Sequence, residues 1–400
     1  YYSTEGSSQC IRAMLFLALQ GAPQSGKRPV LLAARNAHKA LLYAAALLDF
    51  DIRWLWPSAQ AEGALCSCPV TAEALTGALH AMAQQGNTPF GVYVTSPDYL
   101  GGVQELPALA AVCRAQGVPL LVDNAHGAYL RFLPQNCHPI AQGAAMCCDS
   151  AHKTLPVVTG GAYLHLAHDA PVQDEAAVRG ALALFGSTSP SYLILQSLDA
   201  CNAVLAGDYP RRLVQCCAAL EGLRRSLNKT AAARQCPVPL AVAGAQQEPM
   251  KLTLDAAALG CTGTALADAL RRAQLECEYA DPRYVVLMFT PENPPQDYTR
   301  LQTVLEQLLA AVPAGLLRPE NRAGEFAALQ QQAAQRCTIR QAVLGAQVRV
   351  PVHKALGRVC AMPTVSCPPA IPVAVSGEEI TPAAIVLMQR YGIEELSVLR

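Results

Sequence analysis

The sequence predicts an α/β protein whose large first domain holds a mainly parallel sheet, followed by a smaller α+β domain and a C-terminal domain. In the first half of the chain, short apolar runs alternate with helical patterns, as they do in βαβ units. After Asp199 a long helical stretch replaces that alternation. The 400 residues, of which 52% are hydrophobic, are enough for two or three domains with cores of their own.

The first domain, residues 1–200, is predicted to contain five strands with helices between them. The strands are expected at residues 29–34, 51–56, 91–95, 118–123 and 161–166, and the helices at residues 9–20, 38–48, 71–85 and 108–116. Ligands of such sheets bind beyond the carboxyl ends of the strands. The residues that follow each strand are therefore the first candidates for a functional site.

The second and third domains are predicted at residues 201–318 and 319–400. The second has a helical stretch with a break near Pro210, and the third has a helix followed by a segment that three prolines make stiff and extended. Their expected elements are helices at 198–227, 264–274, 302–312 and 323–336, strands at 251–254 and 284–289, and the stiff segment at 367–372.

Charge and cysteine content exclude several classes of partner. Lys plus Arg and Asp plus Glu both number 30, so there is no field of one sign to hold a nucleic acid or an anionic membrane. No apolar run is long enough to span a membrane. The 16 cysteines fit no zinc-binding spacing, so we predict no metal site and interpret most of them as buried thiols in a reducing cytoplasm.

Two residues at predicted strand ends suggest pyridoxal phosphate chemistry. Asp123 follows a buried apolar strand, and Lys153 lies in the later segment Asp149-Ser-Ala-His-Lys-Thr154. A lysine can form a Schiff base with the aldehyde, while an aspartate keeps the pyridine nitrogen protonated. Taken singly, such an aspartate is more often a helix or turn cap, and such a lysine is more often a solvated charge.

Two further segments could complete a cofactor site. The segment Thr4-Glu-Gly-Ser-Ser-Gln9 opens a helix, where hydroxyls and free N–H groups can bind a phosphate. The alternative is an ordinary serine cap. His38 follows a predicted strand and could stack on a flat cofactor, although it could equally be a surface histidine at a helix start.

These residues occur in strings that resemble the Orn/Lys/Arg decarboxylases. The most specific strings are Val122-Asp-Asn-Ala-His-Gly-Ala128 and Ser150-Ala-His-Lys-Thr-Leu-Pro156. Further agreement, in the same order along the chain, comes from Gly6-Ser-Ser8, Arg35-Asn-Ala-His-Lys39, Thr95-Ser-Pro-Asp-Tyr99, Ser187-Thr-Ser-Pro-Ser-Tyr192 and Pro368-Pro-Ala-Ile-Pro-Val-Ala-Val-Ser-Gly-Glu378. The resemblance implies a pyridoxal-phosphate enzyme of the aspartate-aminotransferase fold, also called fold type I.

The resemblance also implies a role for each matching residue. Lys153 would form the internal aldimine, Asp123 would pair with the pyridine nitrogen, and Ala125 and His38 would cover the two faces of the ring. The phosphate or its surroundings would be held by Ser7, Ser8, His126, Ser150 and His152. Because the family's active site forms between two subunits, a homodimer is expected in which Ser187 and Thr188 reach the neighbour's phosphate.

The chain departs from the family pattern at several positions. The family usually carries an acid at Asn124, an aspartate at Ala145, a glutamine at Gly160 and a small residue at Cys10. The family's amino-terminal Pro-Gly-His-Lys-like motif is also absent, and we expect that the natural amino terminus is missing. These departures affect the expectation of full activity and of substrate choice more than the expectation of cofactor binding.

The expected reaction is the decarboxylation of a basic amino acid to the corresponding amine. Lys153 or His152 would return a proton to Cα, and Glu378 would pair with the substrate's distal cation, although Glu378 could instead be a solvated turn residue. The sequence leaves arginine, lysine and ornithine open as substrates. Two alternatives remain: another fold-type-I reaction such as transamination, and a degenerate family member without catalysis.

Overall fold

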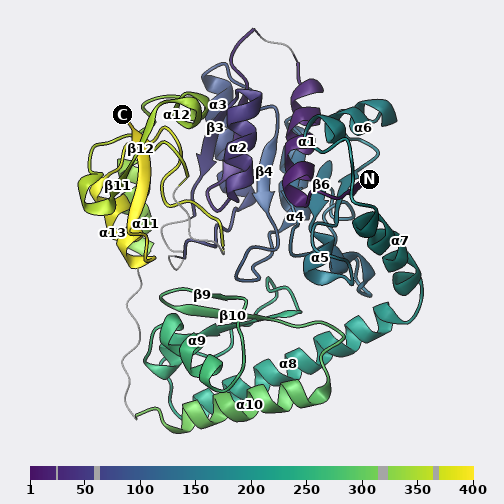
Figure 1. Cartoon of the computed structure of the whole chain (residues 1–400), viewed down its shortest axis with the longest axis vertical. Helices are drawn as coiled ribbons and strands as arrows, with labels where there is room; N and C mark the ends of the chain where they lie inside the picture. The colour runs from purple at the N-terminus through teal and green to yellow at the C-terminus, as the bar shows by residue number, and fades with distance from the viewer. Residues whose placement is uncertain (24–25, 58–63, 314–322, 364–368) are drawn as a thin grey trace.

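The computed structural model describes residues 1–23, 26–57, 64–313, 323–363 and 369–400. Its largest sheet has the strand order β1-β7-β6-β5-β4-β2-β3 (Figure 1). The five adjacent strands β3, β2, β4, β5 and β6 are parallel. At one edge, β7 is antiparallel to β6, and β1 is antiparallel to β7. The strands span Tyr2–Ser3 (β1), Val30–Ala34 (β2), Asp51–Leu55 (β3), Val92–Thr95 (β4), Leu120–Asp123 (β5), Met146–Asp149 (β6) and Ala162–Leu166 (β7).

Helices cover both faces of this sheet because alternate strand residues are apolar on either side. Leu31 and Ala33 pack in one core with α1 and α2, while Leu32 and Ala34 pack in a second core with α3 and α4. The helices of the large domain span Ser7–Gln20 (α1), Lys39–Leu48 (α2), Ala72–Gln84 (α3), Leu106–Ala115 (α4), Ala151–Thr154 (α5) and Glu175–Leu184 (α6). The result is a three-layer α/β/α domain, as the sequence predicts.

Two strands of the large sheet, β1 and β6, were not predicted. β6 is the short run Met146-Cys-Cys-Asp149, in which the adjacent cysteines were interpreted only as buried residues. All four of its residues are buried between β5 and β7. Because β5 and β6 are parallel neighbours, Asp123 and Asp149 both lie at the carboxyl edge of the sheet.

The smaller unit consists of a three-stranded antiparallel sheet and its helices. The strand order is β8-β10-β9. The helix expected at 198–227 is two helices, α7 and α8. The expected break near Pro210 is confirmed at residues 207–208, and Pro210 itself lies in the first turn of α8, where a missing N–H costs nothing. The elements are Tyr192–Ala206 (α7), Tyr209–Ala233 (α8), Lys251–Asp255 (β8), Gly263–Arg272 (α9), Tyr279–Ala280 (β9), Tyr284–Met288 (β10) and Pro295–Ala310 (α10).

The C-terminal unit packs against the outer side of the large domain beside α2 (Figure 1). Its elements are Ala323–Gln332 (α11), Ile339–Leu344 (α12), Gln347–Pro351 (β11), Pro382–Arg390 (α13) and Glu395–Leu399 (β12). Of the expected stiff segment 367–372, the first two residues lie outside the described ranges. Ala370 has a left-handed backbone with φ of 59°, so this segment is not extended throughout.

One apolar core joins all three units, with Cys66, Tyr279 and Val373 each contributed by a different unit. The expected first boundary, between residues 200 and 201, falls inside α7. The boundary at 318–319 lies outside the described residues. Within the described residues, no helix is long and apolar enough to cross a membrane.

Candidate active site at the carboxyl edge of the sheet

Asp123 ends β5 as a buried carboxylate held by neutral donors. The Tyr93 hydroxyl donates to Oδ2 at 3.1 Å, and the backbone N–H of Ala125 donates to Oδ1 at 3.1 Å. The Cys148 thiol on the neighbouring strand donates to the same Oδ1 at 3.7 Å. Because Asp123 is only 2% exposed, these contacts fix its orientation away from bulk water. An opposite charge placed beside it would be strongly stabilised in this environment.

Lys153 lies in α5, the single turn that follows β6, and its amine faces an imidazole. Its Nζ is 3.0 Å from Nε2 of His126, which follows β5. Tyr99 contacts both groups: its ring centroid is 4.8 Å from that of His126 and 6.0 Å from the lysine Nζ. Burial, together with the positive charges of Lys251 and Lys153, lowers the pKa of His126 well below its ordinary value. His126 is therefore neutral, and its Nε2 can accept a hydrogen bond from the Lys153 amine.

A second buried lysine reaches this region from the smaller unit. Lys251 on β8 donates from Nζ to the backbone carbonyls of Asp98 and Tyr99, at 2.9 and 3.3 Å. Burial lowers the pKa of Lys251 to about 8. We call Lys153, His126, Tyr99 and Lys251 the lysine cluster. Because Lys251 belongs to β8 and the others to the large domain, the cluster forms where the two units meet (Figure 1).

The expected phosphate-binding residues converge beside the start of α1. The Ser150 hydroxyl donates to the Ser7 hydroxyl at 2.7 Å, although 143 residues separate them in the chain. Gly6 precedes α1 with φ of 71°, and the helix start has no side-chain cap. Ser8, half-buried, lies in the same first turn. Hydroxyls at an uncapped helix start are suited to an anion such as a phosphate.

His38 caps α2 near Asp123 and Lys153. Its Nδ1 accepts from the backbone N–H of Ala40 at 3.1 Å, which leaves Nε2 as the protonated nitrogen of the neutral ring. Burial lowers the pKa of His38, the charge of Asp123 opposes this shift, and that of Lys153 adds to it. Both charged groups are thus close enough to act on the ring. Ala125, half-buried, lies two residues beyond Asp123.

The remaining residues expected at the site include His152, Ser187 and Thr188. Nδ1 of His152 is 3.0 Å from the backbone carbonyl of Gly161, so a backbone contact orients this half-buried ring. Ser187 and Thr188 are exposed in the loop between α6 and α7, where Ser187 Oγ donates to the carbonyl of Ser189 at 3.4 Å. Within the described residues of one chain, these two are not part of the lysine cluster.

Glu378 has a partner other than the expected substrate. It is 5% exposed, and its Oε2 accepts from Arg35 Nη2 at 3.2 Å and from the backbone N–H of Val375 at 2.8 Å. The Arg35 guanidinium is also stacked between Trp54 and Trp56, 5.0 and 5.1 Å from the ring centroids. The structure therefore gives Glu378 a buried ion pair that joins the C-terminal unit to the residue after β2.

Three residues of the site were missed in the sequence analysis. Tyr93 lies inside β4 and Lys251 lies in another domain, and neither position carries a motif. Tyr99 ends the string Thr95-Ser-Pro-Asp-Tyr99 that supports the family resemblance, so a signal for it was present.

The assembled groups match the parts of pyridoxal phosphate. Lys153 offers an amine for the aldehyde, Asp123 a buried carboxylate for the ring nitrogen, and Ser7 with Ser150 hydroxyls for the phosphate. His126 adds a specific observation, because its Nδ1 is buried and has no hydrogen-bond partner among the described residues. A buried polar atom of this kind is costly unless a ligand satisfies it. The residues present therefore fit the cofactor.

Solved structures with the same fold include lysine decarboxylases. The constitutive lysine decarboxylase of Escherichia coli superposes with a TM-score of 0.73 at 19% identity, over 100% of this chain and 70% of that chain. Lysine decarboxylase A from Pseudomonas aeruginosa gives a TM-score of 0.74 at 16% identity, over 100% and 69%. At these identities the likeness shows the fold, which is fold type I.

Relatives by sequence include an arginine decarboxylase of Bacillus subtilis. It is 26% identical over 394 residues, which cover 95% of this chain and 75% of the relative. The protein YaaO of the same organism, described as uncharacterized, is 29% identical over 264 residues, or 64% of this chain and 52% of YaaO. The matches thus span about half of one curated relative and three quarters of the other.

The family model of the Orn/Lys/Arg decarboxylase major domain matches residues 1–246, more than half of the chain. This range contains Asp123, Lys153 and the two serines that meet beside α1. The residues that fit the cofactor are therefore the ones that the family match covers. The chain belongs to the Orn/Lys/Arg decarboxylase family, a family of pyridoxal-phosphate-dependent decarboxylases.

Proposed function

We propose that this protein removes the α-carboxylate of a basic amino acid as carbon dioxide and releases the corresponding amine. The observation that carries the proposal is the shared sheet edge on which Lys153, His126 and the buried Asp123 meet. Arginine and lysine are the first candidates because named relatives and structural neighbours act on them, and ornithine follows from the family name.

The residues of the site divide the work of holding the cofactor. Lys153 would hold it covalently through its amine, and Ser7 with Ser150 would bind its phosphate. Asp123 would hold a proton at the pyridine nitrogen, where burial strengthens the attraction. When bound, pyridoxal phosphate supplies the electron sink for the bond that breaks. His38 and Ala125 would bound the two faces of the ring.

Proton handling falls to the lysine cluster. The neutral Nε2 of His126 is within hydrogen-bond reach of Lys153, so it can accept a hydrogen bond from the amine and orient it. When Lys153 is not joined to the cofactor and carries a proton, its ammonium group would be the donor that returns a proton to Cα of the substrate. His152 is a second candidate for that step, because the contact of its Nδ1 with Gly161 fixes the ring.

Because Glu378 is paired with Arg35, we propose Glu278 as the acid that selects a basic side chain. Its Oε1 accepts from the Tyr99 hydroxyl at 2.6 Å, and the Tyr99 ring contacts Lys153. A charge-assisted hydrogen bond contributes about 1.5–3 kcal/mol, so Glu278→Gln should reduce the preference for basic over neutral substrates about ten- to a hundred-fold. The matched control is Glu276→Gln, which removes an exposed acid that contacts Arg271.

We propose a homodimer in which Ser187 and Thr188 reach the neighbouring phosphate site. Their loop is flanked by apolar side chains that one chain leaves in water: Leu184 is 61% exposed, Tyr192 82% and Leu193 74%. An exposed apolar patch of this kind is typical of an interface. Sedimentation of wild type and Leu193→Glu would test this, with a dimer expected for the first and a monomer for the second.

We also propose limits for the domains and a cellular compartment for the protein. Three domains, divided at the α7–α8 break and near residues 318–319, match the three separate sheets. A reducing compartment such as the cytoplasm suits the described cysteines, which are free thiols.

The decisive experiment supplies purified protein and pyridoxal phosphate with arginine, lysine or ornithine in turn. Carbon dioxide and the matching amine should appear in equal amounts, and neither should form with Lys153→Ala. Formation of a keto acid instead would establish the transaminase alternative. A cofactor absorbance band without any product from the three amino acids would establish a non-catalytic family member.

A further inference from the structure

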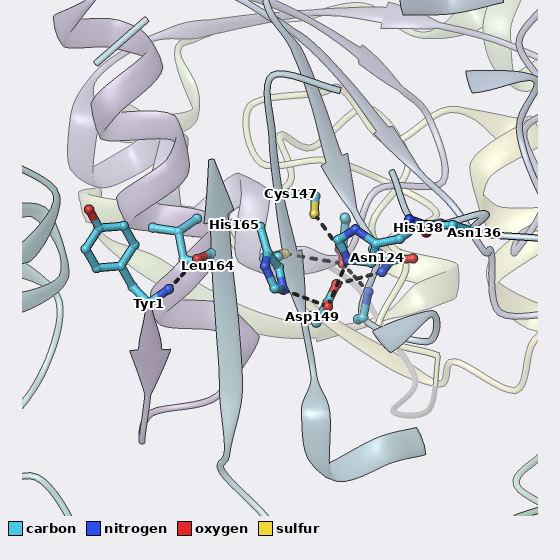
Figure 2. A network of polar contacts seen from close by, with 11 residues as sticks. Tyr1, Asn124, Asn136, His138, Cys147, Asp149, Leu164 and His165 are labelled. Atoms are coloured by element: carbon cyan, nitrogen blue, oxygen red, sulfur yellow. Dashed lines mark hydrogen bonds and ion pairs between the residues drawn. The ribbon is translucent and has the colours of Figure 1, made fainter. Parts of the chain in front are cut away.

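A second polar cluster is formed by Asp149 at the end of β6, His165 on β7 and His138 in the loop before β6. His138 Nε2 and His165 Nε2 both point at Oδ2 of Asp149, at 3.1 and 2.9 Å, from two sides (Figure 2). The two imidazole rings lie edge to face with centroids 4.8 Å apart. We call His138, Asp149 and His165 the Asp149 cluster. Their ligand atoms all lie within 4.8 Å of one another.

The donors match one class of metal ion. Two imidazole nitrogens and a carboxylate oxygen suit zinc and similar divalent transition metals, whereas magnesium and calcium prefer oxygen ligands. A zinc ion about 2.0–2.1 Å from each ligand of a tetrahedron would separate ligand atoms by about 3.3–3.4 Å. The two nitrogen–oxygen separations of 2.9 and 3.1 Å are within a few tenths of an ångström of this value, and the two imidazole nitrogens lie within 4.8 Å of each other.

The surroundings complete the features of a metal site. The other oxygen of Asp149 accepts from Asn124 Nδ2 at 2.6 Å, a contact that leaves Oδ2 directed at the imidazoles. Such outer contacts orient metal ligands. The Cys147 Sγ lies 3.8 Å from His138 Nε2 and offers a fourth donor (Figure 2). All three members of the cluster line a cavity of about 700 Å³, which gives an ion or water room to reach them.

We propose that His138, Asp149 and His165 form a binding site for a divalent transition-metal ion of the zinc type. The site is separate from the cofactor residues but lies next to them in the chain. Asn124 directly follows Asp123, and Asp149 directly precedes Ser150. A bound ion would therefore join the end of β6, which Ser150 follows, to β7 and to the loop that carries His138. The proposal does not depend on which amino acid is decarboxylated.

The test is zinc titration of the cofactor-loaded protein by calorimetry in a buffer that does not bind metals. Wild type should bind one ion per chain, and His165→Gln and Asp149→Asn should each weaken binding by at least about tenfold, the smallest loss usual even for outer-shell changes. His80→Gln removes an exposed histidine on α3 and should leave binding unchanged. Zinc should also raise the melting temperature of wild type and His80→Gln but not of His165→Gln.

X-ray absorption of the zinc-loaded wild type gives a readout that needs no variant, and two imidazole ligands are expected. Zinc that binds equally well to both cluster variants, or that shows only sulfur ligands, would place the ion on free thiols and overturn the proposal. No binding to wild type would also overturn it and identify the Asp149 cluster as a hydrogen-bonded network only.

Discussion

Asp123 and Asp149 end two neighbouring parallel strands, and both are 2% exposed, yet their partners differ. Asp123 accepts hydrogen bonds from a phenol, a backbone amide and a thiol, all of them neutral. Asp149 instead accepts from two imidazoles and an amide. Burial would raise the pKa of Asp149, but His165 and His138 outweigh it and lower that pKa. The chain thus pairs Asp149 with imidazoles, which can carry a positive charge, while the partners of Asp123 are neutral.

This difference separates a carboxylate whose charge can be balanced by side chains of the protein itself from one whose opposite charge must come from a bound cofactor. A buried charge is stable only when it is paired and hydrogen-bonded. Glu378 belongs with Asp149 in this respect, because Arg35 already occupies its carboxylate. Asp123 gains most from a protonated ring nitrogen brought by a cofactor. Replacing each carboxylate, or its partner, should therefore affect different properties of the protein.

The largest expected effect is on stability, at the Arg35–Glu378 pair, whose carboxylate has partners within the chain as Asp149 does. Arg35→Met should lower the free energy of unfolding by about 3–5 kcal/mol, because it leaves Glu378 as an unpaired buried charge. Arg349→Gln breaks the exposed pair with Glu395 between β11 and β12 and should cost less than about 1 kcal/mol. Urea unfolding of both variants measures the difference. Equal losses would contradict the assignment of Glu378 to a buried structural pair.

Asp123→Asn should affect chemistry and leave stability intact. The asparagine oxygen can still accept from the Ala125 N–H, and its amide can donate to the Tyr93 hydroxyl, which can rotate to accept, but the charge that would hold the proton on the ring nitrogen is lost. At about 1.5–3 kcal/mol for a charge-assisted hydrogen bond, turnover should fall at least about ten- to a hundred-fold while the cofactor band is retained. The assay is carbon dioxide release at matched cofactor occupancy, and unchanged turnover would remove Asp123 from the mechanism.

A smaller effect is on the pH dependence of stability. It concerns His126, an imidazole near lysines, in contrast to the imidazoles beside Asp149. His126 has a lowered pKa when folded, because of burial and two nearby lysines, so it stays neutral at a pH where the unfolded chain takes up a proton. The unfolded state then binds more protons, and the stability of wild type falls as pH drops below about 6.5.

His126→Gln should remove that loss of stability. Its unfolding free energy relative to wild type should rise as pH falls from about 7 to about 5.5, by at most about 1.4 kcal/mol per pH unit. Urea titrations at several pH values give this slope. The exposed His80→Gln should run parallel to wild type, and a parallel curve for His126→Gln would show that His126 does not have the lowered pKa.

Local patterns in the sequence were sufficient for the large domain and for the residues at its strand ends. The alternation of apolar runs and helical stretches predicts β2 to β5 and β7 with the helices α1 to α4. Parallel order then brings Asp123 and the segment before Lys153 to one edge. β6 was missed because a four-residue strand with two cysteines has no period that distinguishes it from a loop.

What the sequence could not reveal are contacts between residues far apart in the chain. Arg35 and Glu378 are 343 positions apart, and Lys251 reaches Tyr99 from another domain. No spacing rule predicts such pairs, because they depend on how whole units pack. The same holds for the Asp149 cluster, whose histidines lie 11 and 16 positions from the aspartate and match no metal-binding motif.

The central claim is that Lys153 carries the cofactor on the sheet edge beside Asp123. Borohydride reduction of the cofactor-loaded protein, followed by peptide mapping, tests it most directly. Lys153 should carry the label in wild type, and Lys153→Ala should carry none. The nearby Lys251 provides an internal control, because it is also buried and lies against the same tyrosine. A label on Lys251 or any other lysine in the wild-type protein would contradict the account.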